Sequence, residues 1–201
     1  MKLLMAPASP FVRKVRVVLR ETGQLGAVTE VAVSTTPVAS DPAVVAANPT
    51  GKIPALLRDD GPALFDSRVI TRFLDARAGA RLYPEARIWE VLTLEALADA
   101  MMDAAVVMVY EARYHTPEGL SADWIAGQWD KVARSVAVIE DRWMAHLAGP
   151  LHIGQIGVAC ALGYLDFRHP DRDWRAQAPE LAVWFAAFSE RPSMVETRPG
   201  L

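Results

Sequence analysis

The first half of the fold is decided by residues 2–34, KLLMAPASPFVRKVRVVLRETGQLGAVTEVAVS. Residues 2–6 form a short apolar run that a proline ends, which predicts a buried strand. From Pro10 to about Glu21, apolar side chains recur on one side and arginines on the other, which predicts an amphipathic helix. Residues 29–34 alternate and carry β-branched side chains, so a second strand follows. This order, with short links, predicts a right-handed parallel pair of strands.

The following residues add a short helix, a hairpin and a longer helix. A capping Ser-Asp pair and two prolines predict one or two helical turns between Pro42 and Pro49. Residues 53–58 and 63–65 are strand-like, and the Asp-Asp-Gly between them predicts an antiparallel hairpin. An apolar stripe over residues 68–78, followed by a glycine, predicts a helix with a glycine C-cap. The predicted order is therefore β-α-β-α-β-β-α, which is thioredoxin-like.

The chain then becomes all helix, and its composition and hydrophobic period both change at residues 81–86. We therefore predict an α+β protein with a thioredoxin-like domain over residues 1–80, a linker over 81–86 and an all-helical domain over 87–201. The helix at 153–168 is apolar on all sides, so it is expected at the buried centre of that domain. The helices are expected at 87–115, 121–149, 153–168 and from Pro179 to just before Pro192.

Composition excludes several classes of function. With 52% hydrophobic residues in a chain of 201, the protein has enough apolar mass for a core and is not disordered. A formal net charge of -3 provides no basic field for nucleic acid. A single cysteine, Cys160, allows no internal disulfide, and no metal-ligand cluster is visible. No signal peptide and no apolar run of the ~20 residues that span a bilayer are found, so we expect a cytoplasmic protein without membrane contact.

Three short stretches could carry chemistry. Ser9 stands where the first strand meets the first helix, and a helix start with a hydroxyl stabilises an anion such as a thiolate. Pro54 lies inside a strand signal, where proline is tolerated at an edge or after a cis bond that presents the backbone of Ile53. Asp66 and Ser67 precede another helix, whose free N–H groups can bind a carboxylate. Each stretch also has a purely structural interpretation. Ser9 and Asp66-Ser67 can be ordinary helix caps, and Pro54 can be an ordinary edge-strand proline.

Five stretches together give the chain a family resemblance. In the order in which they occur along the whole chain, they resemble the cytosolic glutathione S-transferase (GST) superfamily, particularly its bacterial members with an active-site serine. The resemblance implies a thioredoxin-like domain that binds glutathione as co-substrate, an all-helical domain, and a homodimer. The stretches are SPFVRKVR at 9–16, NPTGKIPAL at 48–56, FDS at 65–67, IGVACALGYLDFR at 156–168 and RPSMVETRP at 191–199.

The resemblance implies a reaction centred on Ser9, which matches the family's catalytic hydroxyl or thiol. Phe11 lies beside it in the first helical turn. A free thiol has a pKa near ~8.5, and an oriented hydroxyl at a helix N-terminus would bring it toward ~6–7, which raises the thiolate fraction about tenfold or more. The thiolate of glutathione then attacks a small hydrophobic electrophile. Serine stands at position 9, where a dithiol enzyme would have its first cysteine, and Val12 stands where it would have its second. A dithiol mechanism is therefore excluded.

The resemblance also implies how glutathione is held. Ile53, before a cis Pro54, would pair its backbone with the cysteinyl part of glutathione. Asp66 and Ser67 would hold the γ-glutamyl end. Lys52 is the local candidate for the glycine carboxylate, because no lysine or arginine occurs between residues 35 and 50.

The second substrate is expected against the helical domain. Asp99, Met102 and Asp103 share one face of the predicted long helix, so they are the candidates for this site. Asp99 and Asp103 fit equally well as solvated or dimer-interface carboxylates. Met102 also fits as a core residue.

Two departures from the family pattern lie at the start of the central helix. His152 and Gln155 stand where the family has a serine or threonine and an aspartate that form a capping box. Gln155 can still reach back to the cap N–H, but histidine is a poor cap. Gly154 and Gly157 would also weaken the helix by up to ~1 kcal/mol each relative to alanine.

Two other functions fit the same residues. One is the reduction of small disulfides or peroxides with glutathione as the attacking thiol. The other is a GST-fold protein without turnover that binds glutathione, a hydrophobic ligand or a partner. The departures at the central helix and the missing basic residue between positions 35 and 50 keep the second alternative open.

Overall fold

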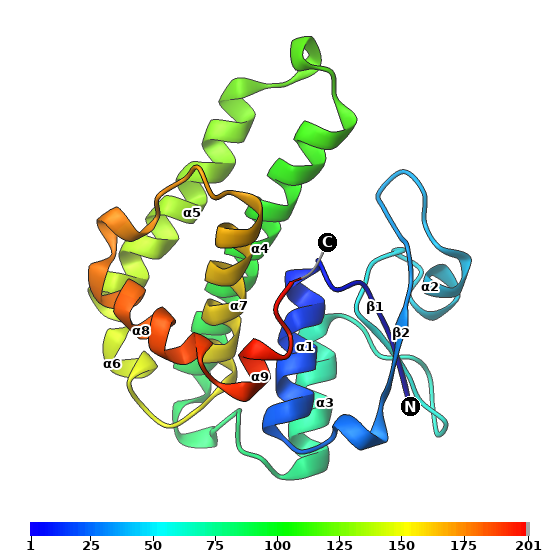
Figure 1. Ribbon diagram of the computed structural model, residues 1–201. Coiled ribbons are helices and arrows are strands. Elements are labelled where there is room, and N and C mark those ends of the chain that lie inside the picture. The colour runs from blue at the N-terminus through cyan, green and yellow to red at the C-terminus, as the bar shows by residue number, and fades with distance from the viewer. Residues whose placement is uncertain (200–201) are drawn as a thin grey trace. The chain divides into compact units, whose positions relative to one another are not determined.

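The computed structural model describes residues 1–199, which form two compact units. The first unit contains Met1–Ala86 together with the segment that begins at Arg191, and the second contains Arg87–Glu190 (Figure 1). The second unit begins at the residue where the sequence places the helical domain. The sequence assigns residues 87–201 to this domain, whereas Arg191 and the described residues that follow it group with the first unit.

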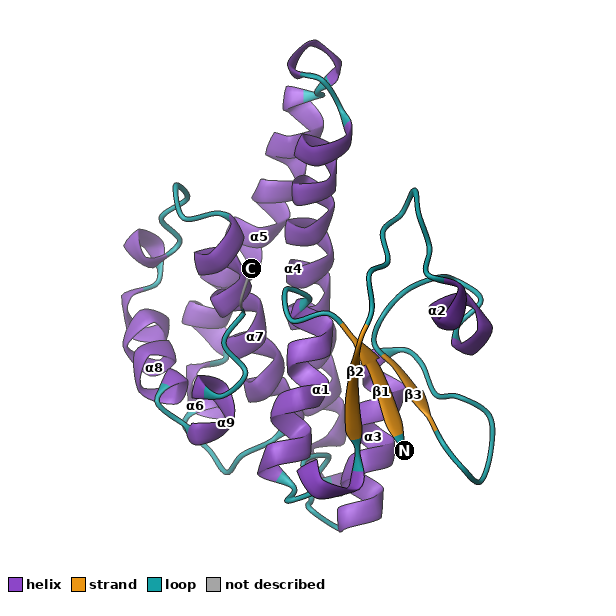
Figure 2. Cartoon of the chain, turned by 45° about the vertical axis from the view of Figure 1, so that its right-hand side comes forward, coloured by secondary structure: helices purple, strands orange, loops and turns teal. Residues whose placement is uncertain are grey.

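The first unit is built on a three-stranded sheet with the order β2-β1-β3 (Figure 2). Its strands are β1 (Lys2–Met5), β2 (Thr29–Ala32) and β3 (Ala55–Leu57). Strand β1 pairs in parallel with β2 through the crossover that the sequence predicts, and antiparallel with β3. The central strand is apolar because both of its neighbours and the helices cover it, and Leu3 and Leu4 are almost fully buried.

The predicted second strand of the hairpin is reduced to a single bridge. Leu64 exchanges two backbone hydrogen bonds of 2.9 Å with Leu56, and no regular strand forms around it. Pro62 has no N–H to donate, and Asp66 already caps the next helix. Too few residues remain between them for a longer ladder, so the sheet has three strands and one bridge.

Helices α1, α2 and α3 of this unit each begin at a capping side chain. Helix α1 (Pro10–Glu21) starts at Ser9, α2 (Pro42–Ala47) starts at Asp41, and α3 (Ser67–Ala78) starts at Asp66. Helices α1 and α3 pack against each other. Helix α3 ends at a glycine with φ 62°, a left-handed conformation that glycine adopts without a steric penalty. This is the thioredoxin-like arrangement that the sequence predicts.

The C-terminal segment is attached to α1 by polar contacts. It carries the short helix α9 (Pro192–Val195). Glu21, in the last turn of α1, accepts hydrogen bonds of 2.9 and 2.8 Å from the Arg191 guanidinium and one from the Ser193 hydroxyl. The bonds from Arg191 hold the pKa of Glu21 below its usual value, against the effect of burial, and Ser193 adds to the lowering. Helical periodicity gives no signal for such a contact.

The second unit is entirely helical, and α4, α5 and α7 lie side by side in it (Figure 1). The predicted helix over 121–149 is divided in two at Trp143. None of the helices within residues 1–199 has the length and apolar character that a membrane span requires. The helices of the unit are α4 (Ile88–Tyr114), α5 (Ala122–Arg142), α6 (Met144–Leu147), α7 (Ile153–Arg168) and α8 (Pro179–Ser189).

The glycines of α7 allow it to approach α4 closely. A Cβ added to Gly157 would lie 3.1 Å from the Cβ of Ala98, and one added to Gly154 would lie 3.1 Å from the Cβ of Leu94. Both contacts are tighter than ordinary van der Waals packing. The helix-weakening glycines noted in the sequence therefore permit the contact between the two helices at the centre of the unit.

Replacing Gly157 with valine is expected to lower the free energy of unfolding by about 1–2 kcal/mol, because the added side chain must displace α4. Gly127 in α5 is the control, since nothing lies within 4 Å of a Cβ placed there. Gly127→Ala should stabilise the protein by up to about 1 kcal/mol through helix propensity. Urea unfolding of both variants measures the difference, and equal effects would contradict the close packing.

The start of α7 keeps half of the capping arrangement. The Oε1 atom of Gln155 accepts a hydrogen bond of 2.8 Å from the His152 N–H, and its amide donates to the carbonyls of Leu147 and Gly149. His152 is 1% exposed, and its Nε2 lies 3.3 Å from the carbonyl oxygen of His146. Its Nδ1 is buried without a hydrogen-bond partner within residues 1–199. Gln155 thus satisfies the cap N–H, while His152 caps nothing through its side chain.

Stability is expected to fall as the pH falls just below 6.5. Burial lowers the pKa of His152 and of His169 from the usual value of 6.5, against their hydrogen bonds to carbonyls. The unfolded chain therefore binds more protons than the folded one in this window, with a slope of at most about 1.4 kcal/mol per pH unit for each histidine. The carboxylates with lowered pKa act only at more acidic pH.

Urea unfolding at about pH 7.5 and about pH 5.5 measures this loss. In His152→Asn, which introduces a side chain that can cap a helix but does not titrate, the difference between the two pH values should become smaller. An unchanged difference would show that His152 titrates normally in the folded protein.

Candidate glutathione site

The sheet register brings three loops to one edge of the first unit. Strand β1 ends at this edge, and β3 begins there because Ala55 lies opposite Leu4. The bridge between Leu64 and Leu56 returns the chain to the same edge, so α3 also begins there. The residues that this arrangement gathers are Ser9, Phe11, Lys52, Ile53, Pro54, Asp66 and Ser67.

The Ser9 hydroxyl oxygen already accepts a hydrogen bond, while its hydrogen is available to donate one. Its Oγ accepts a hydrogen bond of 3.3 Å from the Val12 N–H, as an N-cap does. Within residues 1–199 the hydroxyl hydrogen finds no acceptor, and the residue is only half-buried. Phe11, also half-buried, follows in the first turn. Ser9 can therefore cap α1 and still donate a hydrogen bond to an anion in front of the helix.

The Ile53–Pro54 peptide bond is cis, as the resemblance implies. Pro54 is buried and Ile53 is half-buried. The preceding loop is held by Asn48, whose amide donates to the Lys52 carbonyl over 2.8 Å. Within residues 1–199 the backbone N–H and C=O of Ile53 make no hydrogen bond. This donor and acceptor pair remains available to the backbone of a peptide.

The start of α3 combines a charged cap with an unused hydroxyl. Asp66 accepts a hydrogen bond of 3.0 Å from the Arg68 N–H and another of 3.0 Å from the Arg68 guanidinium. Although partial burial opposes ionisation, Arg68 and the charge of Lys14 hold the pKa of Asp66 below its usual value. The Ser67 side chain is almost fully buried, and its hydroxyl has no partner within residues 1–199.

Arg68 and Lys14 both lower the pKa of Asp66, and the sequence alone identified neither residue. Arg68 directly follows the Asp-Ser pair, and this position could have indicated a contact with Asp66. Lys14 is completely buried in α1, and its position in the helix alone gave no indication of an effect on Asp66. Lys52 is exposed and forms no ion pair with the described residues 1–199, so its ammonium group is accessible.

The residues predicted for a second substrate all lie on α4 but differ in exposure. Asp99 is buried and Asp103 is exposed, and both interact with other residues of the protein. Met102 is 0% exposed, so it has no surface that a ligand could touch. Met102 is therefore a core residue, which is the alternative that the sequence left open.

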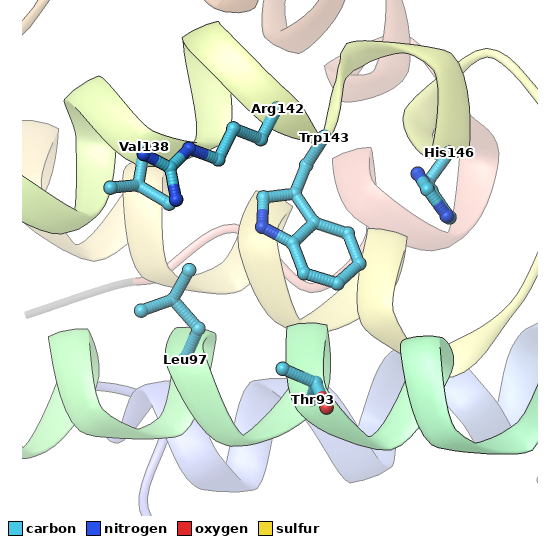
Figure 3. A pocket seen from close by; sticks show the side chains of 6 residues that line it. All are labelled: Thr93, Leu97, Val138, Arg142, Trp143 and His146. Atoms are coloured by element: carbon cyan, nitrogen blue, oxygen red, sulfur yellow. The ribbon is translucent and has the colours of Figure 1, made fainter.

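The helical unit also contains a small cleft of about 360 Å³ between α4 and the region where α5 meets α6. Figure 3 shows the Trp143 indole between Leu97 and His146. Trp143 contacts the His146 ring at a centroid distance of 4.8 Å. None of the predicted substrate residues lines this cleft, which is formed by Thr93, Leu97, Val138, Arg142, Trp143 and His146.

Two family models match the chain. The N-terminal domain of glutathione S-transferase matches residues 8–77, and the C-terminal domain of glutathione S-transferase matches residues 122–187. The chain is also 31% identical to the uncharacterized GST-like protein YibF of Escherichia coli K12, over 99% of this chain and 98% of that protein.

Solved structures give the same result. A glutathione transferase family member from Pseudomonas fluorescens Pf-5, with bound glutathione, is 50% identical, with a TM-score of 0.97 over 100% of this chain and 99% of that chain. A glutathione S-transferase from Methylobacillus flagellatus KT, also with glutathione bound, is 36% identical, with a TM-score of 0.86 over 99% of both chains. These similarities cover both units.

Proposed function

This chain belongs to the glutathione S-transferase family, and from that membership and the site geometry we propose that it binds reduced glutathione and adds its thiolate to a small electrophile. The observation that carries the proposal is the gathering of three unused hydrogen-bonding groups at one edge of the sheet. These groups are the Ser9 hydroxyl, the Ile53 backbone and the Ser67 hydroxyl.

Each of these groups matches one part of glutathione. The Ile53 N–H and C=O would pair with the backbone of the cysteinyl residue. Ser67, at the N-terminus of α3, would bind the γ-glutamyl carboxylate with help from the helix dipole. Asp66 would bind the γ-glutamyl ammonium while it keeps its contact with Arg68. Lys52 would bind the glycine carboxylate.

Ser9 would then orient the sulfur. Its hydroxyl would donate a hydrogen bond to the thiolate, and the N-terminus of α1 would add a favourable electrostatic field. Both effects stabilise the charged form of the thiol, so the pKa of the bound thiol falls and more thiolate is present at neutral pH. The sulfur lone pair can then form a bond to an electrophilic carbon.

The chemistry of one relative supports an acceptor of this kind. The Pseudomonas fluorescens protein has also been solved with bound S-(propanoic acid)-glutathione, at 49% identity to this chain. That ligand is a thioether of glutathione, which is the class of product that thiolate addition gives. Reduction of a disulfide or peroxide by the same thiolate remains the alternative for this site, and a glutathione-binding protein without turnover is the other.

By family resemblance we also propose a cytoplasmic homodimer. Light scattering should then give a solution mass of twice 22.0 kDa. A mass of one chain would contradict the dimer without affecting the assignment of the glutathione site, because the three groups above belong to one chain.

The test is a calorimetric titration with reduced glutathione, followed by thiolate absorbance of the complex against pH. Binding in the micromolar to millimolar range with a thiol pKa clearly below its free value of about 8.5 would support an enzyme that activates the thiol. Binding without a pKa shift would favour a carrier and contradict the proposed activation. No binding would contradict the glutathione assignment altogether.

A further inference from the structure

The C-terminal segment contacts helix α1 at two levels. We call residues 191–197 the C-terminal strap, and its helix α9 lies beside α1 (Figure 1). Side chains of the strap donate hydrogen bonds to Glu21 in the last turn of α1. About two helical turns earlier, the Arg13 guanidinium donates a hydrogen bond of 3.0 Å to the Met194 carbonyl. The strap is therefore bonded to α1 both near its start and at its end.

The strap belongs to the packed interior of the first unit. Met194 and Thr197 are 0% exposed, and Ser193 is 4% exposed. The Thr197 hydroxyl donates a hydrogen bond of 2.7 Å to the Ser193 carbonyl. Glu196 forms an ion pair with Arg20 of α1 over 2.9 Å. Because its side chains are buried or paired, the strap has a fixed place on α1.

Arg13 connects the strap to the start of α1, where Ser9 lies. The Arg13 residue is 6% exposed, and its backbone N–H donates a hydrogen bond of 3.0 Å to the Ser9 carbonyl. The preceding N–H, that of Val12, donates to the Ser9 hydroxyl oxygen over 3.3 Å. Two successive N–H groups thus hold both oxygens of Ser9, and the strap fixes the side chain of one of these two residues.

The apolar face of α1 fixes this first turn less strictly than the strap does. Val12 and Val15 are 0% exposed, but the hydrophobic effect that buries them has no preferred direction. A hydrogen bond, in contrast, weakens steeply when its angle departs far from linear. The bond from Arg13 to the Met194 carbonyl therefore restrains how the start of α1 is rotated, and with it the direction of the Ser9 side chain.

We propose that Arg13, held by the C-terminal strap, is a positioning residue that fixes the orientation of the Ser9 hydroxyl toward the glutathione sulfur. Groups that act on a reacting atom must be held within about 0.5 Å of their productive position, and a shift of about 1 Å can cost about 100-fold in rate. Arg13 acts through Ser9 in this scheme. The inference rests on the proposed function, because it assigns Arg13 to the activation of the glutathione thiol.

The first test replaces Arg13 in the full chain. Arg13→Met removes the donor to Met194, so kcat for conjugation should fall about 3- to 10-fold and the thiol pKa of bound glutathione should rise toward its free value. The dissociation constant for glutathione should stay within about twofold of wild type, because the proposed binding groups lie on other loops. Arg13→Lys keeps a donor for the Met194 carbonyl and should restore most of both effects.

The second test weakens the strap far from Ser9. Glu21→Gln removes the charge that pairs with the strap, at a residue about 18 Å along the helix axis from Ser9. It should raise the thiol pKa in the same direction as Arg13→Met but by less, because the Met194 carbonyl is then held less firmly. Asp166→Asn is the matched control, since it removes the charge that pairs with Arg175 in the helical unit. It should leave the thiol pKa as in wild type.

A double-mutant cycle decides whether Arg13 acts through Ser9. In a Ser9→Ala background, Arg13→Met should leave the thiol pKa unchanged, because the hydroxyl that it positions is gone. An equal pKa rise with and without the Ser9 hydroxyl would overturn the inference, and so would a wild-type thiol pKa in Arg13→Met. If Arg13→Met fails to fold, Glu21→Gln decides in both backgrounds, and a wild-type thiol pKa in that variant overturns the inference.

The wild-type protein separates this inference from the proposed function. A wild type that binds no glutathione, or binds it without a lowered thiol pKa, contradicts the proposed function, and the role of Arg13 falls with it. A wild type that lowers the thiol pKa, together with strap variants that lower it equally, keeps the proposed function and overturns only the role of Arg13 and the strap.

Discussion

Ser9→Ala is expected to lower kcat/KM for glutathione conjugation about 100-fold, while the dissociation constant for glutathione changes by no more than about twofold. In the proposed mechanism the Ser9 hydroxyl stabilises the thiolate, whereas glutathione would be held mainly by groups on other loops. The thiol pKa of the bound glutathione should rise toward its free value. Steady-state kinetics, calorimetry and thiolate absorbance on the same preparations measure the three quantities.

The capping role of Ser9 requires a matched control, because its loss also removes the hydrogen bond from Val12 and costs about 1 kcal/mol of stability. Ser121 caps α5 with the same geometry, accepting from the Trp124 N–H over 3.3 Å. Ser121→Ala should lose similar stability and keep full activity. Ser9→Thr retains a hydroxyl and should keep most of the rate. A Ser9→Ala enzyme with undiminished turnover would remove Ser9 from the mechanism.

Ser67→Ala is expected to weaken glutathione binding about 10- to 100-fold, the loss typical of a hydrogen bond to a charged group. The Ser67 hydroxyl has no partner within residues 1–199, so the substitution breaks no internal hydrogen bond. The urea midpoint should therefore remain within error of the wild type. Calorimetric titration measures the affinity.

Ser34→Ala serves as the control, because Ser34 is exposed in the loop after β2. It should bind glutathione as the wild type does. If Ser67→Ala retained full affinity, the γ-glutamyl end would have to be held by the backbone of α3 and Asp66 alone. If Ser67→Ala instead lost stability, the hydroxyl would have an internal partner and the affinity change would no longer report on the ligand.

Much of the fold could be predicted from local sequence signals. Prolines, caps and hydrophobic periods placed α1, α3 and α7 within a residue or two of their observed ends. The sequence-based predictions are wrong where tertiary structure overrides these local signals. The strand expected at 63–65 lacks the length for a ladder, and the apolar period continues through Trp143 although the helix does not.

The candidate site shows the same division between backbone and side chains. The local sequence predicts the position of Ser9 at a helix start, and the family resemblance implies the cis bond before Pro54. The pairing of Asp66 with Arg68 depends on rotamers, and a single sequence does not specify these. An amphipathic pattern does not decide whether Met102 is buried, because it shows two faces of a helix without showing what covers each one.

The C-terminal segment has a consequence for the order in which the protein can be made. Residues 1–86 leave the ribosome long before Arg191, whose guanidinium pairs with Glu21, and before Glu196, whose carboxylate lies 2.9 Å from the Arg20 guanidinium. Until then, the end of α1 lacks these partners. Domains usually fold as they emerge during synthesis. Here the unit that emerges first is completed last, after the whole helical unit has been translated.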